Sequence, residues 1–141
     1  MEQGKHLVID VLTKKPDKLS DKKFTRKFFK IIIKEIEMKA VLPIILYQFP
    51  SLIKIKRNIK GRKGKKGKGG ITAFCILEES HISCHSWPEE NYIAYDIYSC
   101  RNFDEKKVIN LLYKYLPIEN LTFKVIMRSV QKLKTTSKKF H

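Results

Sequence analysis

The 141-residue sequence predicts an α+β fold, a two-layer sandwich of a mainly antiparallel sheet with helices on one face. Two observations lead to this prediction. The expected elements follow one another as strand, helix, three strands, helix and strand, an order that lets consecutive strands pair as antiparallel neighbours. Both expected helices are apolar on one side only, which is typical of helices that cover one face of a sheet. With 43% hydrophobic residues the chain can form one core, so we expect a single domain over residues 1–141.

The first half of the chain contains a strand, a helix and a second strand. Residues 5–12 (KHLVIDVL) are a compact apolar run, which is typical of a buried strand. A helix is expected over about 21–38, because Ser20 is a suitable N-cap and the apolar residues after it recur at helical spacing. Residues 40–49 are expected as another strand, and Pro43 places that strand at a sheet edge or at a bulge.

The second half contains three further strands and a helix. Residues 71–85 are expected as a strand or hairpin, and residues 91–100 as another strand. Asp104 is the expected cap of the second helix, and residues 120–128 form the last strand. The stripe of this helix that faces the sheet is expected to contain Val108, Leu111, Leu112 and Tyr115.

The net charge of +16 is concentrated in two segments. Residues 54–68 hold nine Lys or Arg and residues 128–141 hold five, with no acidic residue in either, so the rest of the chain is nearly neutral. We interpret the first as a solvated basic loop insertion over about 52–70 and the second as a basic tail. Clustered cations can also bind nucleic acid, but the GxxxxGK[ST] spacing of a phosphate loop is absent. Nucleic acid is therefore not the favoured partner.

The expected location is the cytoplasm, without a membrane partner. The segment MEQGKHLVIDVL lacks a signal-peptide cleavage site, and no apolar stretch approaches the ~20 residues that cross a bilayer. The three cysteines, Cys75, Cys84 and Cys100, form an odd set without a CxxC pair. That pattern favours free thiols in a reducing compartment.

His81, Cys84 and His85 have the residue types of a zinc site. Zinc sites usually draw three or four ligands from two segments, and no further ligand is evident in this sequence. In an extended segment, His81 and His85 would share a face that Cys84 avoids. We therefore expect no metal.

Reactive side chains are unusually frequent in two nearby segments, EESHISCHSWPE (78–89) and YDIYSC (95–100). Together they resemble the self-processing segment of the S-adenosylmethionine decarboxylases of the short bacterial and archaeal type. The resemblance extends to GKHLVIDV (4–11) and YQFP (47–50), and covers most of residues 4–127.

The resemblance implies that the chain is a proenzyme that cleaves itself between Glu79 and Ser80. The products would be a β chain, residues 1–79, and an α chain, residues 80–141, whose first residue becomes a covalent pyruvoyl cofactor derived from Ser80. The pyruvoyl group would form a Schiff base with the substrate.

Three other residues take roles from the same resemblance. His85 matches the residue that transfers protons during processing, and Thr72 stands where the family usually has a serine that supports it. Cys100 matches the proton donor of decarboxylation. The chemistry is physically reasonable, because decarboxylation of an amino acid leaves a carbanion that needs an electron sink. A ketone supplies that sink, and it has to be made from the backbone because side chains contain none.

The resemblance also implies the substrate site and the assembly. Phe49 lies at the position that stacks on adenine, Glu89 matches the glutamate that binds the ribose diol, and Trp87 shapes the same wall. The implied substrate is S-adenosylmethionine, decarboxylated for polyamine (spermidine) synthesis, and the implied assembly is a homodimer of processed units.

Two departures from the family pattern keep alternatives open. Arg101 stands where the family commonly has glycine after the cysteine, and a short turn is expanded to residues 50–71. L-Ornithine or L-arginine is the alternative substrate within the same fold. A non-catalytic relative that binds nucleic acid or an acidic partner through the basic loop is the alternative from another class.

Overall fold

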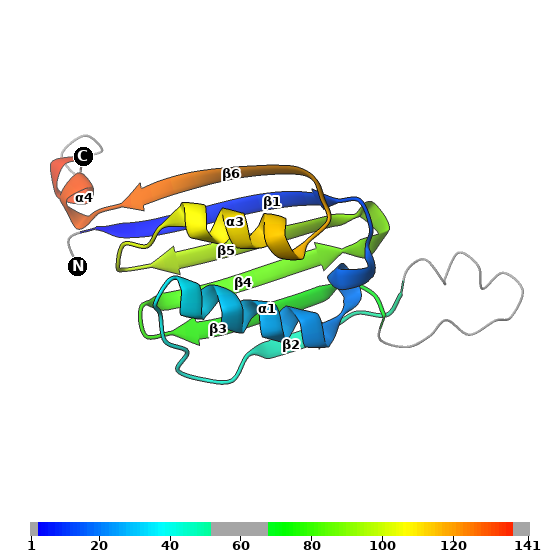
Figure 1. Cartoon of the computed structure of the whole chain (residues 1–141). Helices are drawn as coiled ribbons and strands as arrows, with labels where there is room; N and C mark the ends of the chain where they lie inside the picture. Colours follow the sequence, from blue (N-terminus) through cyan, green and yellow to red (C-terminus); the bar gives the residue numbers. More distant parts are fainter. Residues whose placement is uncertain (1–2, 52–67, 137–141) are drawn as a thin grey trace, which may run out of the picture.

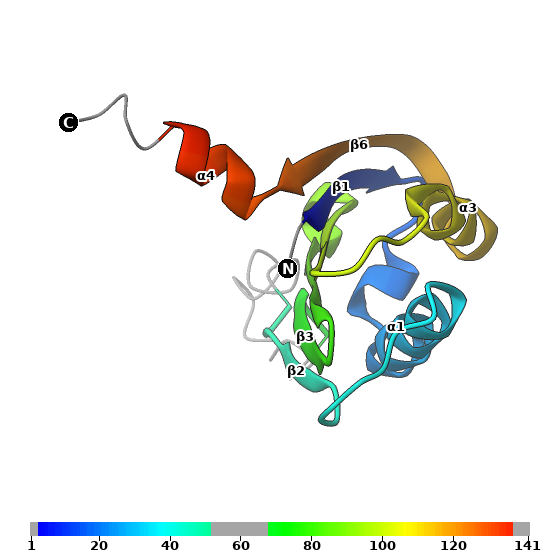
Figure 2. The same ribbon diagram turned by 90° about the vertical axis from the view of Figure 1, so that its left-hand side faces the viewer.

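The computed structural model describes residues 3–51 and 68–136. Its six strands form one antiparallel sheet in the order β2-β3-β4-β5-β1-β6. Helices α1 and α3 cover one face of this sheet (Figures 1 and 2). The fold is therefore the predicted two-layer α+β sandwich. The elements are β1 (Gly4–Thr13), η1 (Asp17–Ser20), α1 (Lys22–Glu35), β2 (Ile45–Gln48), β3 (Ile71–Leu77), β4 (Ser80–Trp87), η3 (Pro88–Glu90), β5 (Tyr92–Ser99), α3 (Glu105–Tyr115), β6 (Ile118–Arg128) and α4 (Val130–Thr136).

Helix α1 begins one residue later than its predicted cap implied. The N-cap is Asp21, whose carboxylate accepts a hydrogen bond from the Phe24 amide at 3.0 Å. Ser20 was the wrong choice, because it ends η1 and its hydroxyl donates to the Asp17 carbonyl instead. The helix also ends at Glu35 rather than at residue 38, and Glu37, with a φ of 57°, turns the chain back toward the sheet.

Helix α3 begins as predicted. The Asp104 carboxylate accepts from the Lys106 amide at 2.9 Å. Val108 and Leu112 are fully buried against the sheet, whereas Leu111 and Tyr115 lie half-buried at the margin of the helix.

Two segments differ from the sequence-based expectation. Strand β2 begins at Ile45 rather than at residue 40, because Pro43 has no N–H to pair; Ala40 contributes only an isolated bridge to Leu77. As predicted for a strand near a proline, β2 lies at an edge of the sheet. The basic tail starts with a short helix, α4, that projects from the sheet (Figure 2). Most of the basic loop, residues 52–67, and the tail from residue 137 lie outside the described residues.

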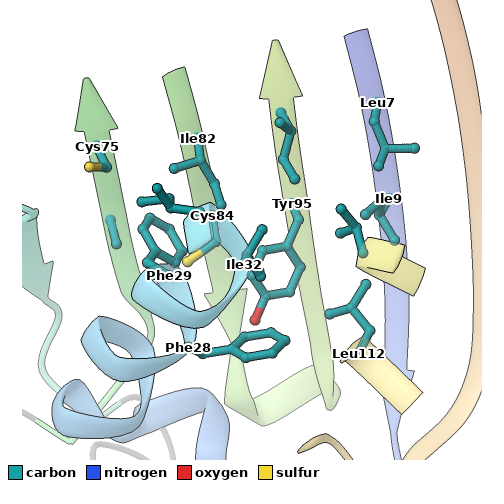
Figure 3. Close-up of a cluster of buried hydrophobic side chains, with 14 of the residues drawn as sticks. Leu7, Ile9, Phe28, Phe29, Ile32, Cys75, Ile82, Cys84, Tyr95 and Leu112 are labelled. Carbon is teal, nitrogen blue, oxygen red and sulfur yellow. The ribbon is translucent and has the colours of Figure 1, made fainter. Parts of the chain in front are cut away.

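The two faces of the sheet differ in their surroundings. On the covered face, side chains such as Ile82, Cys84 and Tyr95 pack against Phe28 and Phe29 of α1 (Figure 3). The opposite face, which we call the open face, has no helix over it in the described chain (Figure 2). Its exposed large apolar side chains are Leu12, Ile45, Tyr47, Ile76, Trp87 and Ile126. These side chains leave apolar surface on the open face that another surface could cover.

Candidate active site

The β3–β4 hairpin carries most of the predicted site residues. Successive side chains of a strand point to opposite faces, so Ile82, Cys84 and Ser86 face the helices and are buried. His81 and His85 lie on the open face, as the sequence predicted. The hairpin therefore presents its imidazoles to the uncovered side of the sheet.

One end of the hairpin lines a pocket of about 310 Å³. Five predicted site residues meet there, from β3, β4, η3 and the segment after β2. They are Phe49, Thr72, His85, Trp87 and Glu89. The Phe49 and Trp87 side chains are 48% and 42% exposed, so their rings are available to a ligand. The pocket combines aromatic walls with one carboxylate and one imidazole, which suits a small organic molecule that has a polar end.

Thr72 and His85 face each other across the hairpin and form a polar pair in this pocket. They are register partners, and the Thr72 hydroxyl lies 3.0 Å from His85 Nδ1. That contact fixes the orientation of the ring and leaves Nε2 for a proton acceptor or donor role.

Three further residues line the pocket and were not predicted: Pro50, Gly70 and Ser86. Gly70 has to be glycine, because a Cβ there would lie 2.1 Å from the Ser86 carbonyl oxygen. The Ser86 hydroxyl accepts from the Ile71 amide at 2.9 Å and donates to the Leu19 carbonyl at 2.6 Å. Ser86 thus fixes the start of β3. These contacts could not be predicted from the sequence, because each depends on segments that meet only in the folded chain.

The other end of the hairpin is a two-residue turn, Glu78–Glu79, followed by Ser80. Two-residue hairpin turns favour positive φ angles at the central residues, which glutamate adopts poorly. Here neither glutamate has a positive φ, and Ser80 has one instead, at 149°. A non-glycine residue in this region is strained by roughly 1–3 kcal/mol. The strain lies at the predicted scissile bond.

Cys100 contacts the same bond through its backbone. Its amide donates a 2.8 Å hydrogen bond to the carbonyl oxygen of Glu79, and its side chain is exposed immediately after β5. An N–H group aimed at a carbonyl oxygen polarises the carbonyl and stabilises negative charge that develops there.

The other two cysteines are unsuited to chemistry. Cys75 and Cys84 are buried on the covered face, and burial raises the pKa of the Cys84 thiol to about 12 and the pKa of Cys75 as well. Of the three, only Cys100 presents its thiol to solvent beside the β3–β4 turn.

His81 lies next to the strained serine but packs among aromatic rings. Its ring stacks on Phe74 at 5.2 Å, and it lies 5.9 Å from the ring of Tyr98. Burial first, and the neighbouring His6 second, lower the pKa of His81 and so favour its neutral form. In the residues that the structure describes, no group of three His, Cys, Asp or Glu side chains is placed to hold a metal ion.

The structure does not bring the predicted site residues together in one chain. Ser80 and His85 lie five residues apart on β4, which at ~3.3 Å per residue separates them by about 16 Å. Glu79, Ser80 and Cys100 therefore form one candidate half-site at the β3–β4 turn. Phe49, Thr72, His85, Trp87 and Glu89 form the other half-site, around the pocket.

The fold and these half-sites define a two-layer α+β protein whose reactive residues occupy the two ends of one hairpin. A family model described as S-adenosylmethionine decarboxylase matches residues 5–129. Because this match spans most of the chain, the chain belongs to the S-adenosylmethionine decarboxylase family.

Individual relatives agree with this assignment. The S-adenosylmethionine decarboxylase proenzyme of Clostridium botulinum strain Langeland is 28% identical over 126 residues, 89% of this chain and 93% of the relative. The proenzyme of strain Loch Maree is 26% identical over the same shares of both chains. The crystal structure of the adenosylmethionine decarboxylase from Aquifex aeolicus superposes with a TM-score of 0.69 at 21% identity, covering 92% of each chain. This last likeness supports the fold alone. No helix among the described residues is long and apolar enough to cross a membrane.

Proposed function

We propose that this chain is a self-cleaving S-adenosylmethionine decarboxylase proenzyme whose scissile bond joins Glu79 to Ser80. The observation that carries the proposal is the geometry of that bond. Ser80 has a strained φ of 149°, and the Glu79 carbonyl accepts the Cys100 amide at 2.8 Å. Strain raises the ground-state energy of the bond, and the amide stabilises the oxyanion that attack creates.

The cleavage chemistry follows from the residues at the turn. The Ser80 hydroxyl gives up its proton and attacks the carbonyl carbon of Glu79; the C–N bond then breaks and the nitrogen takes a proton, which leaves an ester. Removal of the Ser80 α-proton expels the Glu79 carboxylate and leaves a dehydroalanine. Addition of water and loss of ammonia convert this residue to the pyruvoyl group. Each step needs a base or an acid near neutral pH, which is the chemistry of an imidazole.

The imidazole of His85 cannot serve its own chain, since it lies about 16 Å along β4 from Ser80. We propose that two copies pack open face against open face, in opposite directions. The turn of each copy then meets the pocket of the other. The six exposed apolar side chains of the open face support this pairing, because a dimer would bury them.

The turn fits the proposed cofactor. Ser80 is half-buried at the start of β4 and next to an exposed thiol, so a group formed there would be accessible to substrate. When formed, the pyruvoyl ketone supplies the electron sink for decarboxylation of an α-amino acid. The Cys100 thiol would hold the proton that the product carbon receives.

The pocket suits a nucleoside better than a bare amino acid. Phe49 and Trp87 offer exposed aromatic surface, on which a base stacks with about 1–3 kcal/mol. The Glu89 carboxylate can accept both hydroxyls of a ribose. Ornithine and arginine have no base ring to stack on the aromatic wall, although their cationic ends could contact these rings or pair with Glu89. The stacking surface therefore favours S-adenosylmethionine as the substrate.

The test is carbon dioxide release from S-adenosylmethionine, L-ornithine and L-arginine in parallel, with the Ser80→Ala protein as the control. We expect release from S-adenosylmethionine and none from the control. Release from ornithine or arginine alone would contradict S-adenosylmethionine as the substrate but would agree with the pyruvoyl chemistry. No release from any of the three would contradict the function.

A further inference from the structure

The side chain of Arg101 joins three segments around the β3–β4 turn. Its guanidinium Nη2 donates to the Glu37 carbonyl, at the corner where the chain leaves α1. The same nitrogen lies 3.9 Å from the Glu79 carboxylate. A glycine, which the family pattern commonly has at this position, could make neither contact.

The Glu79 carboxylate is held from two sides. One oxygen accepts from the Lys39 amide at 3.4 Å, and the other faces Arg101. The Glu79 side chain is only 15% exposed, whereas that of Arg101 is 52% exposed. An exposed ion pair by itself contributes only about 0–1 kcal/mol to stability. A larger effect of this pair would therefore come from the groups that it holds in place.

The pair positions the Cys100 amide. Strand β5 ends at Ser99, and residues 100 and 101 pair with no strand of the described chain. Their remaining contacts are the Cys100 amide on the Glu79 carbonyl and the Arg101 amide on the Ser99 hydroxyl at 2.9 Å. The Arg101 side chain adds ties to Glu79 and Glu37. A shift of Arg101 would therefore move the N–H group that contacts the scissile carbonyl.

We propose that Arg101 is a positioning residue for self-cleavage. It holds the Cys100 amide on the Glu79 carbonyl by tying both to the corner at Glu37, and so it accelerates the first step, the transfer of the acyl group from nitrogen to oxygen. This role rests on the proposed function. It gives a purpose to Arg101, a residue that differs from the family pattern.

The test follows the conversion of full-length chain into the two fragments by intact mass, with and without hydroxylamine. Hydroxylamine cleaves esters but leaves peptide bonds intact, so it reveals an ester that has formed but has not yet eliminated. The variants are Arg101→Gln, which removes the charge, and Arg101→Lys, which keeps it. Arg26→Gln, on the exposed side of α1, is the matched control.

We expect Arg101→Gln to cleave about tenfold more slowly, as for the loss of a charged hydrogen bond. Hydroxylamine should not restore its rate, Arg101→Lys should regain part of it, and Arg26→Gln should match the wild type. Cleavage of Arg101→Gln at the wild-type rate would overturn the proposal. Restoration of the rate by hydroxylamine would also overturn it, because the ester would then form normally.

A second measurement separates this proposal from the proposed function. In the uncleavable Ser80→Ala background, amide hydrogen exchange at Cys100 reports its hydrogen bond directly. Arg101→Gln should speed that exchange about tenfold, whereas Arg26→Gln should not change it. Unchanged exchange would refute the positioning role. Faster exchange together with a wild-type chain that never cleaves would refute the proposed function and leave the positioning of the amide intact.

Discussion

A mixed dimer of two inactive chains should regain cleavage, because the half-sites lie too far apart to work within one chain. The perturbation is co-expression of Ser80→Ala and His85→Ala chains that carry different tags. Each chain alone lacks a residue needed at both sites of its dimer. In the mixed dimer, Ser80 of the His85→Ala chain meets His85 of the Ser80→Ala chain, so one of the two sites is complete.

The expected extent of cleavage follows from the distance between Ser80 and His85 and from random pairing of the two kinds of chain. A distance of about 16 Å along β4 is several times the reach of a hydrogen bond, which prevents cleavage within one chain. If the chains pair at random, half of the dimers are mixed, so about half of the His85→Ala chains should be cut, each once. The Ser80→Ala chains should stay intact.

The assay is intact mass of each tagged chain after the mixed dimer has been purified through both tags. In that fraction nearly all His85→Ala chains should appear as residues 1–79 and 80–141. No cleavage in a verified mixed dimer would refute the shared site. Rapid cleavage of the His85→Ala chain by itself would show that another group serves as the base. The imidazole nearest to Ser80 in the sequence of the same chain is that of His81.

Three further predictions concern single residues. Cys100→Ala should still cleave, because its amide remains, but should release carbon dioxide slowly or lose activity during turnover; unchanged turnover would remove the thiol from the mechanism. Phe49→Ala should raise the KM for S-adenosylmethionine about tenfold or more, as expected for the loss of one stacked base, and a KM equal to that of the wild type would place the base elsewhere. Gly70→Ala should lower the free energy of unfolding by about 1–3 kcal/mol, because the new Cβ meets the Ser86 carbonyl at 2.1 Å; an unchanged urea midpoint would contradict this contact.

The elements that the sequence predicted correctly depend on local signals. The cap at Asp104 and the apolar stripe of α3 need only neighbouring residues, as do the alternating side chains of β4. The cap of α1 was misplaced by one position, because Ser20 and Asp21 are both good caps and the turn η1 decides between them. The start of β2 was misplaced because an apolar run does not show where pairing begins.

The candidate site, like the fold, could be predicted only where the signal was local. The motif around Ser80 and His85 supplied the candidate residues, but their separation along the chain follows only from the bounds of β4 in the structure. The contacts of Gly70 with Ser86 and of Arg101 with Glu37 were not predictable. Each joins segments whose approach is set by the packing of the whole sheet and by the end of α1.

Intact mass of the purified wild-type chain, denatured after long incubation, tests the central claim most directly. The account predicts two species, residues 1–79 with an ordinary carboxyl end and residues 80–141 with a pyruvoyl group in place of Ser80. The Ser80→Ala chain, treated identically, should remain at full length. A wild-type chain that also remains at full length would contradict self-cleavage between Glu79 and Ser80.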